Sequence, residues 1–487
     1  MNPDDIDVLI VGAGLSGIDA ACHLRRHCPD RRFVVLEARH GLGGTWSLFR
    51  YPGIRSDSDM YTLGYGFKPW TGEQAIADGP SILEYLKDTA REYDLERHIR
   101  YRHRVVAASW STADARWTVR VQRTLSDGSQ DEITLRAGFL MMCGGYYRYD
   151  QPYTPEFAGR ERFTGRIVHP QHWPDDLDVV GRRVVVIGSG ATAVTLVPEL
   201  ARDAAQVTML QRTPTYMITR PGRDALARRL FDRFGPRIGH ALTRWKNLLM
   251  GMLVFGLARR RPEAFKQRLV GWVRQQLPSG YDVGRHFTPP YRPWDQRLCL
   301  VPDGDFFQAI RAGRVDVVTD RIESFTERGI RLASGQELPA DLIVTATGLQ
   351  LNTLADLTLE VDGHTLKPAD LLNYKGLMFA GVPNFVATFG YTNASWTLKA
   401  DLVSRWVCRV LEHQRKTGTR QCVAHCHEPQ MPRRPWVDFT SGYFERAIDL
   451  LPRQGDHGPW KLNQNYLSDL VALRWGPLED GILRFSR

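Results

Sequence analysis

Two glycine-rich segments are the residues whose types and spacing point most clearly to chemistry. The first, Gly12-Ala13-Gly14-Leu15-Ser16-Gly17, follows the apolar run Val8–Val11 and opens a helical pattern that continues through Arg26. In such a strand–turn–helix the first glycine makes the turn, the second lets backbone approach a pyrophosphate, and the third lets helix pack on strand. A second apolar run, 33–36, ends at Glu37, 20 residues after the last glycine. A carboxylate at this spacing binds a ribose hydroxyl in dinucleotide sites.

The pattern recurs 176 residues later with the opposite charge at the ribose position. The run Val184–Ile187 leads into Gly188-Ser189-Gly190-Ala191-Thr192-Ala193, followed by a predicted helix and a predicted strand at Val207–Leu210. This strand ends in Gln211-Arg212, with no acid in the next four residues. An acid repels a 2′-phosphate, whereas a guanidinium binds it with paired hydrogen bonds. The first site therefore suits FAD and the second NADPH. The alternative interpretation of Arg212 is a solvated charge at a strand end.

Two further apolar strands, Phe139–Cys143 and Leu342–Thr345, each lead into glycine and mark where the chain would leave and re-enter the first domain. The sequence therefore predicts an α/β fold with two Rossmann-like dinucleotide-binding domains, the second inserted in the first. The predicted boundaries are 1–150 plus 345–487 for the FAD-binding domain and 151–344 for the NADPH-binding domain, with a basic helical insertion at about 220–295.

The composition and the chain start argue against several other classes of protein. Hydrophobic residues make up 43% of the 487 and charged residues 24%, which is typical of chains that bury a core. Residues 1–5 are acidic where a signal peptide would be positive. The longest apolar stretch, Leu248–Ala258, gives a helix of about 17 Å, too short for a hydrocarbon core of about 30 Å. We therefore expect neither a leader nor a membrane span.

The seven cysteines are scattered and odd in number, which favours reduced thiols and a cytoplasmic location. No CxxC pair occurs, so a disulfide reductase is excluded. The cluster Cys422, His425, Cys426 and His427 has no spacing known for structural zinc. We interpret it as a polar surface loop and predict no metal.

The basic charge of the chain belongs to one segment. From Arg220 to Arg274 there are 14 basic and three acidic side chains, a net charge of +11 against +10 for the whole chain. A solvated helix face, a peripheral membrane contact and electrostatic steering of NADPH are the three interpretations. No nucleic-acid-binding motif accompanies the charge, so no nucleic acid is expected. No pattern in the sequence specifies an oligomeric state.

Two longer stretches carry a resemblance to a known family. They are Gly43–Asp57 (GGTWSLFRYPGIRSD) and Phe163–Pro174 (FTGRIVHPQHWP). Both resemble the class B flavin monooxygenases, and the second fits the FxGxxxHxxxW[P/D] fingerprint of the Baeyer–Villiger branch. Further matching segments extend the resemblance over almost the whole chain. Together they resemble the branch of the family that activates thioamides.

The resemblance implies a reaction and a set of roles. NADPH would reduce FAD, O₂ would form a C4a-peroxyflavin, and this would convert ketones to esters and oxidise the sulfur of thioamides or sulfides. The implied FAD contacts are Ser16 at the pyrophosphate, Glu37 at the ribose, Gly44, Thr45, Trp46 and Leu48 around the flavin, Val105 at the adenine through its backbone, Arg55, Ser56 and Asp57 between flavin and nicotinamide, and Thr392-Asn393 at the start of a helix facing the pyrimidine edge.

Arg297 falls at the family's catalytic arginine. A guanidinium stays charged at working pH and can stabilise an oxygen anion in a site that excludes water. Asp57 would orient Arg297, while Gln296 stands where many relatives have lysine. A salt bridge at the domain interface is the alternative interpretation of Arg297. For the whole protein, the alternatives are a monooxygenase that acts only on heteroatoms and a non-catalytic NADPH- and FAD-binding redox sensor.

Overall fold

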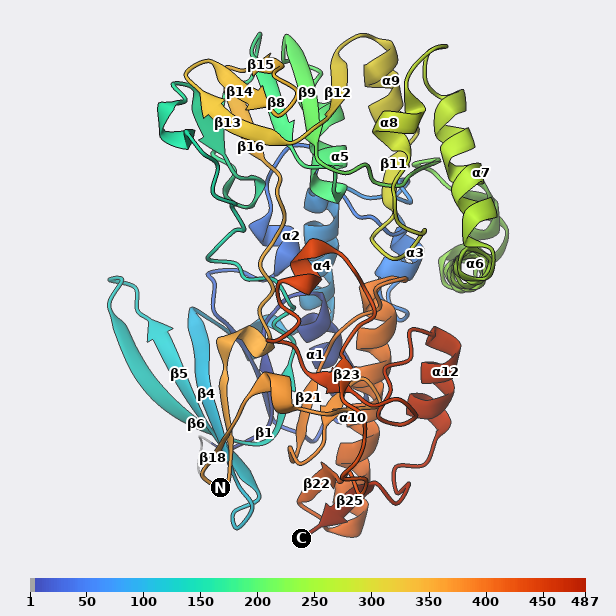
Figure 1. Cartoon of the computed structure of the whole chain (residues 1–487). Helices are drawn as coiled ribbons and strands as arrows, with labels where there is room; N and C mark the ends of the chain where they lie inside the picture. Colours follow the sequence, from blue (N-terminus) through green and yellow to red (C-terminus); the bar gives the residue numbers. More distant parts are fainter. Residues whose placement is uncertain (1–4) are drawn as a thin grey trace.

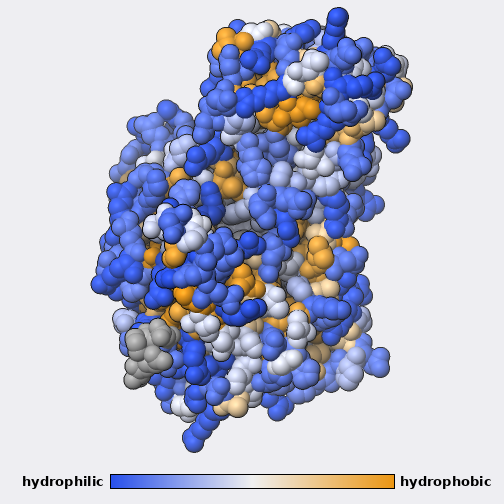
Figure 2. Space-filling view, turned by 90° about the vertical axis from the view of Figure 1, so that its left-hand side faces the viewer, coloured by the Kyte–Doolittle hydropathy of each residue, from blue (hydrophilic) through white to orange (hydrophobic). Residues whose placement is uncertain are grey.

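The computed structural model describes residues 5–487. Residues 1–4, which contribute to the expectation that there is no signal peptide, lie outside this range. The described chain forms two lobes that share a connecting region, with the helices α6 and α7 along one edge (Figure 1). In the view of Figure 2, the opposite side is mostly hydrophilic, and hydrophobic residues are confined to patches.

The lower lobe of Figure 1 contains a mixed sheet centred on β1. β1 pairs in parallel with β2 and β6, and Val8 faces both Phe33 and Phe139 across these pairs. Val8 has no exposed surface, as expected for a parallel strand covered on both faces. The sheet, in spatial order, contains β18 (His364–Leu366), β17 (Thr358–Val361), β4 (His103–Ser111), β5 (Arg116–Thr124), β6 (Gln130–Met142), β1 (Asp5–Val11), β2 (Phe33–Glu37) and β3 (Ile99–Tyr101), with β21 (Phe385–Ala387) also on β6.

The long strand β6 joins the parallel part of the sheet to its antiparallel part. Its first half pairs antiparallel with β5, and its second half pairs in parallel with β1 and β21. The predicted strand at Phe139–Cys143 is therefore the end of a longer element that also supports an antiparallel extension.

The upper lobe contains a second, parallel sheet. In spatial order it contains β12 (Val315–Thr319), β9 (Gln206–Gln211), β8 (Arg183–Ile187), β16 (Leu342–Thr345) and β7 (Arg166–Val168). Short pairs complete the strands: β10 (Met217–Arg220) with β11 (Cys299–Pro302), β13 (Ile322–Thr326) with β14 (Gly329–Leu332) and β15 (Glu337–Pro339), β19 (Asn373–Tyr374) with β20 (Met378–Phe379), β22 (Gln421–Ala424) with β25 (Leu483–Ser486), and β23 (Arg434–Pro435) with β24 (Arg453–Gln454).

Helices cover both sheets and form the insertion. They are α1 (Leu15–His27), α2 (Thr45–Leu48), α3 (Met60–Leu63), α4 (Gly79–Glu92), α5 (Ala191–Leu200), α6 (Ala225–Arg260), α7 (Pro262–Gln275), α8 (Val283–Phe287), α9 (Asp305–Arg311), α10 (Trp396–Thr417), α11 (Gly442–Glu445) and α12 (Tyr466–Leu470). α6 is kinked at Gly235, which has a φ of 74° and stands directly before Pro236. Among residues 5–487, no helix combines the length and hydropathy needed to cross a bilayer.

The chain passes from the first sheet to the second and then back to the first. β17, β18 and β21 follow the last strand of the second sheet in sequence but pair within the first. The second Rossmann-like unit is thus inserted in the first, which confirms the predicted fold class.

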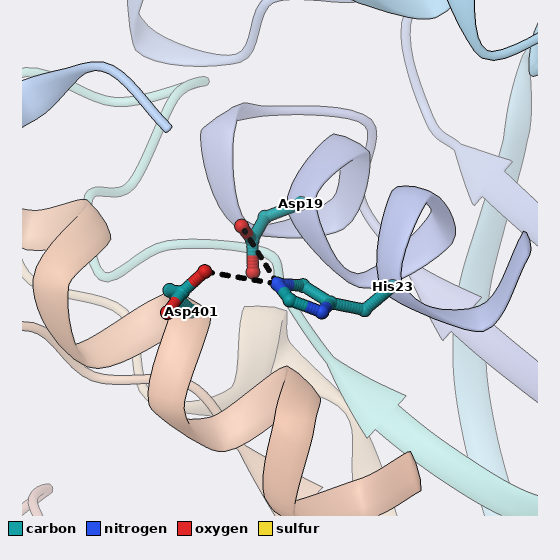
Figure 3. Close-up of side chains that lie close together, drawn as sticks. All are labelled: Asp19, His23 and Asp401. Carbon is teal, nitrogen blue, oxygen red and sulfur yellow. Dashed lines mark hydrogen bonds and ion pairs between the residues drawn. The ribbon is translucent and has the colours of Figure 1, made fainter. Parts of the chain in front are cut away.

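A buried polar cluster joins α1 to α10 (Figure 3). Nε2 of His23 lies 3.0 Å from Oδ1 of Asp401 and 3.8 Å from Oδ1 of Asp19. Ser404 donates a hydrogen bond of 2.7 Å to the other oxygen of Asp19. Burial raises the pKa of Asp19 to about 7, against an ordinary value of 3.8. The carboxyl therefore keeps a proton in the folded chain at pH values where the unfolded chain has lost it.

This cluster predicts a pH-dependent stability. Because the pKa of Asp19 is raised in the folded state, its protonated carboxyl makes its full contribution to stability below about pH 4. This contribution is lost as the pH rises toward 7. Asp19→Asn replaces the acid with a group that does not titrate. The free energy of unfolding of the variant, relative to wild type, should increase by on the order of 2 kcal/mol between pH 5 and pH 8. Denaturant unfolding at both pH values measures it, and a difference that does not change with pH would contradict it.

Candidate active site

One continuous cavity of about 1640 Å³ lies where the carboxyl ends of strands from both sheets meet. Residues just after β1, β2 and β6 line one part of it, and residues just after β8, β9 and β16 line another. Open parallel sheets bind ligands at this end of their strands. Pockets for one small molecule measure about 300–1,000 Å³, so this cavity has room for more than one ligand.

The glycines of the first segment allow close backbone approach. Gly12 has a φ of +101°, and a Cβ there would lie 2.8 Å from the carbonyl oxygen of Cys143. A Cβ on Gly17 would lie 1.8 Å from the carbonyl oxygen of Gly12. A Cβ on Gly44 would lie 3.0 Å from Cα of Gly14. These positions exclude side chains, so Gly12 and Gly44 present only backbone to the cavity and Gly17 lets α1 pack closely on the turn.

The helices that begin at the two glycine-rich segments have free N-termini. α1 and α5 follow Gly14 and Gly190, and neither has a side-chain cap. By contrast, Asp59, Asp78 and Asp224 cap α3, α4 and α6. Uncapped N–H groups at a helix N-terminus favour an anionic ligand, because they are unsatisfied and lie at the positive end of the helix dipole. Because α1 and α5 also follow the two glycine-rich turns, their N-termini are suited to bind phosphate.

Polar side chains fix the first groove. Glu37 is buried, and its two oxygens accept hydrogen bonds from the backbone N–H of Ala13 at 2.8 Å and of Arg39 at 2.9 Å. Ser16 accepts a hydrogen bond of 2.8 Å from the indole of Trp396, the first residue of α10. The glycine-rich turn is thus held by its own strand-end acid and by a distant helix.

The second groove carries basic side chains. Ser189 donates to the carbonyl of Thr213 at 2.9 Å, which holds the chain beyond β9 against the glycine-rich turn. Arg212 and Arg321 both line the cavity, and both are exposed. Across the described range 5–487, neither guanidinium makes a salt bridge. Both remain free to meet an anion.

An ion pair links the two halves of the cavity. Nη1 of Arg297 donates to Oδ2 of Asp57 at 2.5 Å, and both side chains are about one-third exposed (34% and 37%). Asp57 follows α2, whereas Arg297 lies between α8 and β11. Asp57 holds the pKa of Arg297 well above its usual value. The guanidinium is therefore a permanent cation in the cavity wall.

Three tyrosines surround this arginine. The phenols of Tyr146, Tyr147 and Tyr443 lie near the guanidinium, and the hydroxyls of Tyr146 and Tyr147 are 2.6 Å apart. Burial raises the pKa of all three phenols, so they stay neutral. Tyr146 also stacks on Trp396, with ring centroids 5.1 Å apart and an interplanar angle of 10°. The guanidinium is thus held by a carboxylate and lies beside neutral aromatic hydroxyls.

Comparisons with known proteins support the same interpretation. Residues 10–75 match the NAD(P)-binding Rossmann-like domain, and residues 76–250 match the flavin-binding monooxygenase-like family. The FAD-containing monooxygenase EthA of Mycobacterium tuberculosis (strain ATCC 25618 / H37Rv) is 53% identical, over 99% of this chain and 98% of its own. The probable FAD-binding monooxygenase AlmA of Acinetobacter baylyi is 44% identical, over 99% and 96%. The solved structure of an oxidized steroid monooxygenase bound to NADP has a TM-score of 0.73 at 26% identity, covering 88% of both chains.

The chain belongs to the class B flavin monooxygenases. It is an FAD-containing monooxygenase, which confirms the family and the FAD predicted from the sequence, and the NADP of the solved steroid monooxygenase supports the predicted NADPH. The comparisons thus favour an enzyme over the non-catalytic redox sensor. The side-chain-free glycine wall and the two uncapped helices fit the phosphates of two dinucleotides.

Most residues predicted for the site line this monooxygenase's cavity. Lining it are Gly12, Gly14, Ser16, Glu37, Gly44, Thr45, Trp46, Arg55, Ser56, Asp57, Val105, Gly188, Ser189, Gly190, Ala191, Thr192, Arg212 and Arg297. Outside the lining are Gly17, Leu48, Ala193, Gln211, Thr392 and Asn393. Gly17 and Ala193 lie inside α1 and α5, where small residues let the helix approach its strand.

At three predicted positions the structure places the residues differently from the expectation, and their contact with a cofactor stays a prediction. Leu48 packs against the core of the second unit instead of the cavity. Gln211 is buried, and its amide donates to the carbonyl of His286 and to the hydroxyl of Thr319. α10 begins at Trp396, after Thr392 and Asn393. The backbone N–H of Thr392 donates to the side chain of Gln464, and the amide of Asn393 donates to its carbonyl, so a distant segment holds both outside the helix.

The sequence interpretation missed Tyr146, Tyr147, Tyr443 and Arg321. Tyr146 and Tyr147 follow Gly144-Gly145 at the end of β6, which is a ligand-facing position in this kind of sheet. That placement could have identified them. Tyr443 and Arg321 offered no local signal, because only the fold brings them to the cavity.

Gly17→Ala tests the glycine wall. The added methyl group would collide with backbone, so α1 must move away from β1, at a cost of roughly 1–3 kcal/mol or more. We expect a lower melting temperature and less FAD retained after purification. Gly190→Ala is the matched control, since a Cβ there meets nothing within 4 Å. Equal melting temperature and flavin content in the two variants would contradict the prediction.

Proposed function

We propose that this monooxygenase inserts oxygen beside the carbonyl of ketones, giving esters, and oxidises the sulfur of thioamides and sulfides. One atom of O₂ enters the product and the other leaves as water, with NADPH supplying two electrons. The observation that carries the proposal is the Arg297–Asp57 pair within a cavity that both grooves share. Attack on a carbonyl creates an oxygen anion, and a fixed cation stabilises it.

The proposed assignment of domains follows the two sheets. Residues 1–150 with 345–487 bind FAD, and residues 151–344 bind NADPH. In the first groove, the N–H groups of α1 and the side chain of Ser16 bind pyrophosphate, while Glu37 binds ribose. In the second groove, α5 binds pyrophosphate and Arg212 binds the 2′-phosphate.

The mechanism assigns a separate task to each side chain. Bound FAD, reduced by NADPH, supplies O₂ activation. Arg297 stabilises the negative charge that develops on the oxygen of the substrate carbonyl. Asp57 holds the guanidinium in one orientation, and the phenols of Tyr146 and Tyr443 lie beside it. The aromatic wall also limits water, which strengthens the interaction between cation and oxyanion.

We also propose a peripheral membrane contact through the basic segment 220–274. Its net charge of +11 favours an anionic surface, and exposed apolar side chains accompany the charge.

Arg297→Ala tests the catalytic assignment. Removing the cation should lower ester formation from an aryl ketone by about 100-fold or more, while NADPH still reduces the flavin. Product chromatography and NADPH absorbance measure the two steps. Arg183→Ala, which breaks a surface pair of 2.6 Å with Asp341, is the matched control and should retain both. Ester formation by Arg297→Ala at the wild-type rate would refute the role. Sulfide oxidation without any ester in wild type would favour a heteroatom-only enzyme.

Arg212→Ala tests the second groove. Loss of the guanidinium should raise the KM for NADPH by about 10- to 100-fold and leave the KM for NADH nearly unchanged, because only NADPH carries the 2′-phosphate. Steady-state oxidation of the two coenzymes measures this. An unchanged KM for NADPH would favour the solvated strand-end charge instead.

A further inference from the structure

Helix α6 presents apolar side chains on the side that faces away from the protein. Leu242, Trp245, Leu249 and Leu253 are 43–56% exposed, and Ile238, one turn earlier, is 56% exposed. Their spacing of three or four residues places them on one stripe, which we call the α6 stripe. A helix at a protein surface normally carries charged or polar residues on that side. Trp245 touches Tyr466 at one edge of the stripe, with ring centroids 6.2 Å apart, and the rest of the stripe is an exposed apolar face.

The opposite side of α6 is fixed to the protein. Gly239, His240 and Thr243 are buried, and Arg244 donates to the backbone carbonyls of Tyr61, Thr62 and Gly64 at 2.7–3.2 Å. The helix cannot rotate to bury its stripe without breaking these bonds. Leu248 is also buried on this inner side.

The charge around the stripe selects its partner. No acid lies between Asp232 and Glu263, whereas Arg233 and Arg237 precede the stripe and Arg259, Arg260 and Arg261 follow it. Two copies of this chain would bring two segments of charge +11 together, so the stripe repels a second copy. An anionic lipid surface attracts it, because the apolar row enters the acyl boundary while arginines meet the headgroups.

The stripe is linked to the arginine of the active site. Trp294 packs on Phe255 of α6 and Phe265 of α7, with ring centroids 5.6 and 6.0 Å apart. Arg259, at the end of α6, pairs with Asp295 at 2.8 Å. Arg297 lies two residues beyond Asp295. The segment that presents Arg297 to the cavity is thus anchored on the helix pair that carries the stripe.

We propose that the α6 stripe docks this enzyme on anionic bilayers and that the docked enzyme takes apolar ketones or sulfides directly from the lipid. This rests on the proposed monooxygenase function and adds its substrate class, which is membrane-dissolved molecules. Docking through the stripe places the helix pair that anchors the Arg297 segment at the lipid surface, next to the substrate reservoir.

The test uses the FAD-loaded full chain and two variants. Leu249→Glu with Leu253→Glu introduces charge into the stripe. Val180→Glu, at an apolar side chain outside α6 that is 68% exposed, is the matched control. Flotation uses vesicles of phosphatidylglycerol with phosphatidylcholine, and of phosphatidylcholine alone, at low and high salt. Turnover is measured with a water-soluble aryl ketone and with a long-chain methyl ketone dissolved in the anionic vesicles.

Wild type and Val180→Glu should float with anionic vesicles at low salt. The fraction of the stripe variant that floats with the same vesicles should be lower by about tenfold or more. The stripe variant should oxidise the soluble ketone at the wild-type rate and the vesicle-borne ketone about tenfold more slowly. Absence of wild-type flotation, or equal binding and vesicle turnover by the stripe variant, would overturn the proposal. So would a wild-type dimer that the stripe variant dissociates. Failure of every form to oxidise the soluble ketone would instead contradict the proposed function.

Discussion

The ion pair between Arg297 and Asp57 is the interaction on which the rest of the structure depends. It joins a residue after α2 to one 240 positions later, so it can form only when both Rossmann-like units are folded and in contact. Both side chains are about one-third exposed and thus partly withdrawn from water, and removing one partner leaves the charge of the other uncompensated. The phenols of Tyr146 and Tyr443 lie beside the cation and stay neutral, so they do not cancel its charge. The remaining architecture serves to bring this pair next to two bound dinucleotides.

The two grooves share the same backbone arrangement and differ in their side chains. Each begins with a parallel strand, a glycine turn and a helix without a side-chain cap, so that phosphate can satisfy the free N–H groups. Glu37 ends one strand and is held by backbone N–H groups, whereas Arg212 ends the other and remains unpaired among residues 5–487. This difference in charge is the basis of the proposal that FAD binds in the first groove and NADPH in the second. The inserted order of the units then makes the grooves share one cavity.

Local patterns in the sequence predicted the parts of the fold that local physics determines. The apolar runs, the glycine spacing and the charges at Glu37 and Arg212 were enough for two dinucleotide units, since each lies within one strand–turn–helix. The contacts that shape the catalytic wall span long distances in sequence. Gln464 holds Thr392 and Asn393 before α10, and Tyr443 reaches Arg297 from a segment with no motif. The outward apolar row on α6 was equally hidden, because periodicity alone does not tell which side of a helix packs on the protein.

A double-mutant cycle on Arg297 and Asp57 tests the central claim most directly, with ester formed per NADPH consumed as the measured quantity. If Asp57 acts through the guanidinium, Asp57→Asn lowers this ratio in the wild-type background and has no further effect when Arg297 is already alanine. The two substitutions are then strongly non-additive. Independent, multiplying effects, or a ratio that Asp57→Asn leaves unchanged, would contradict the account.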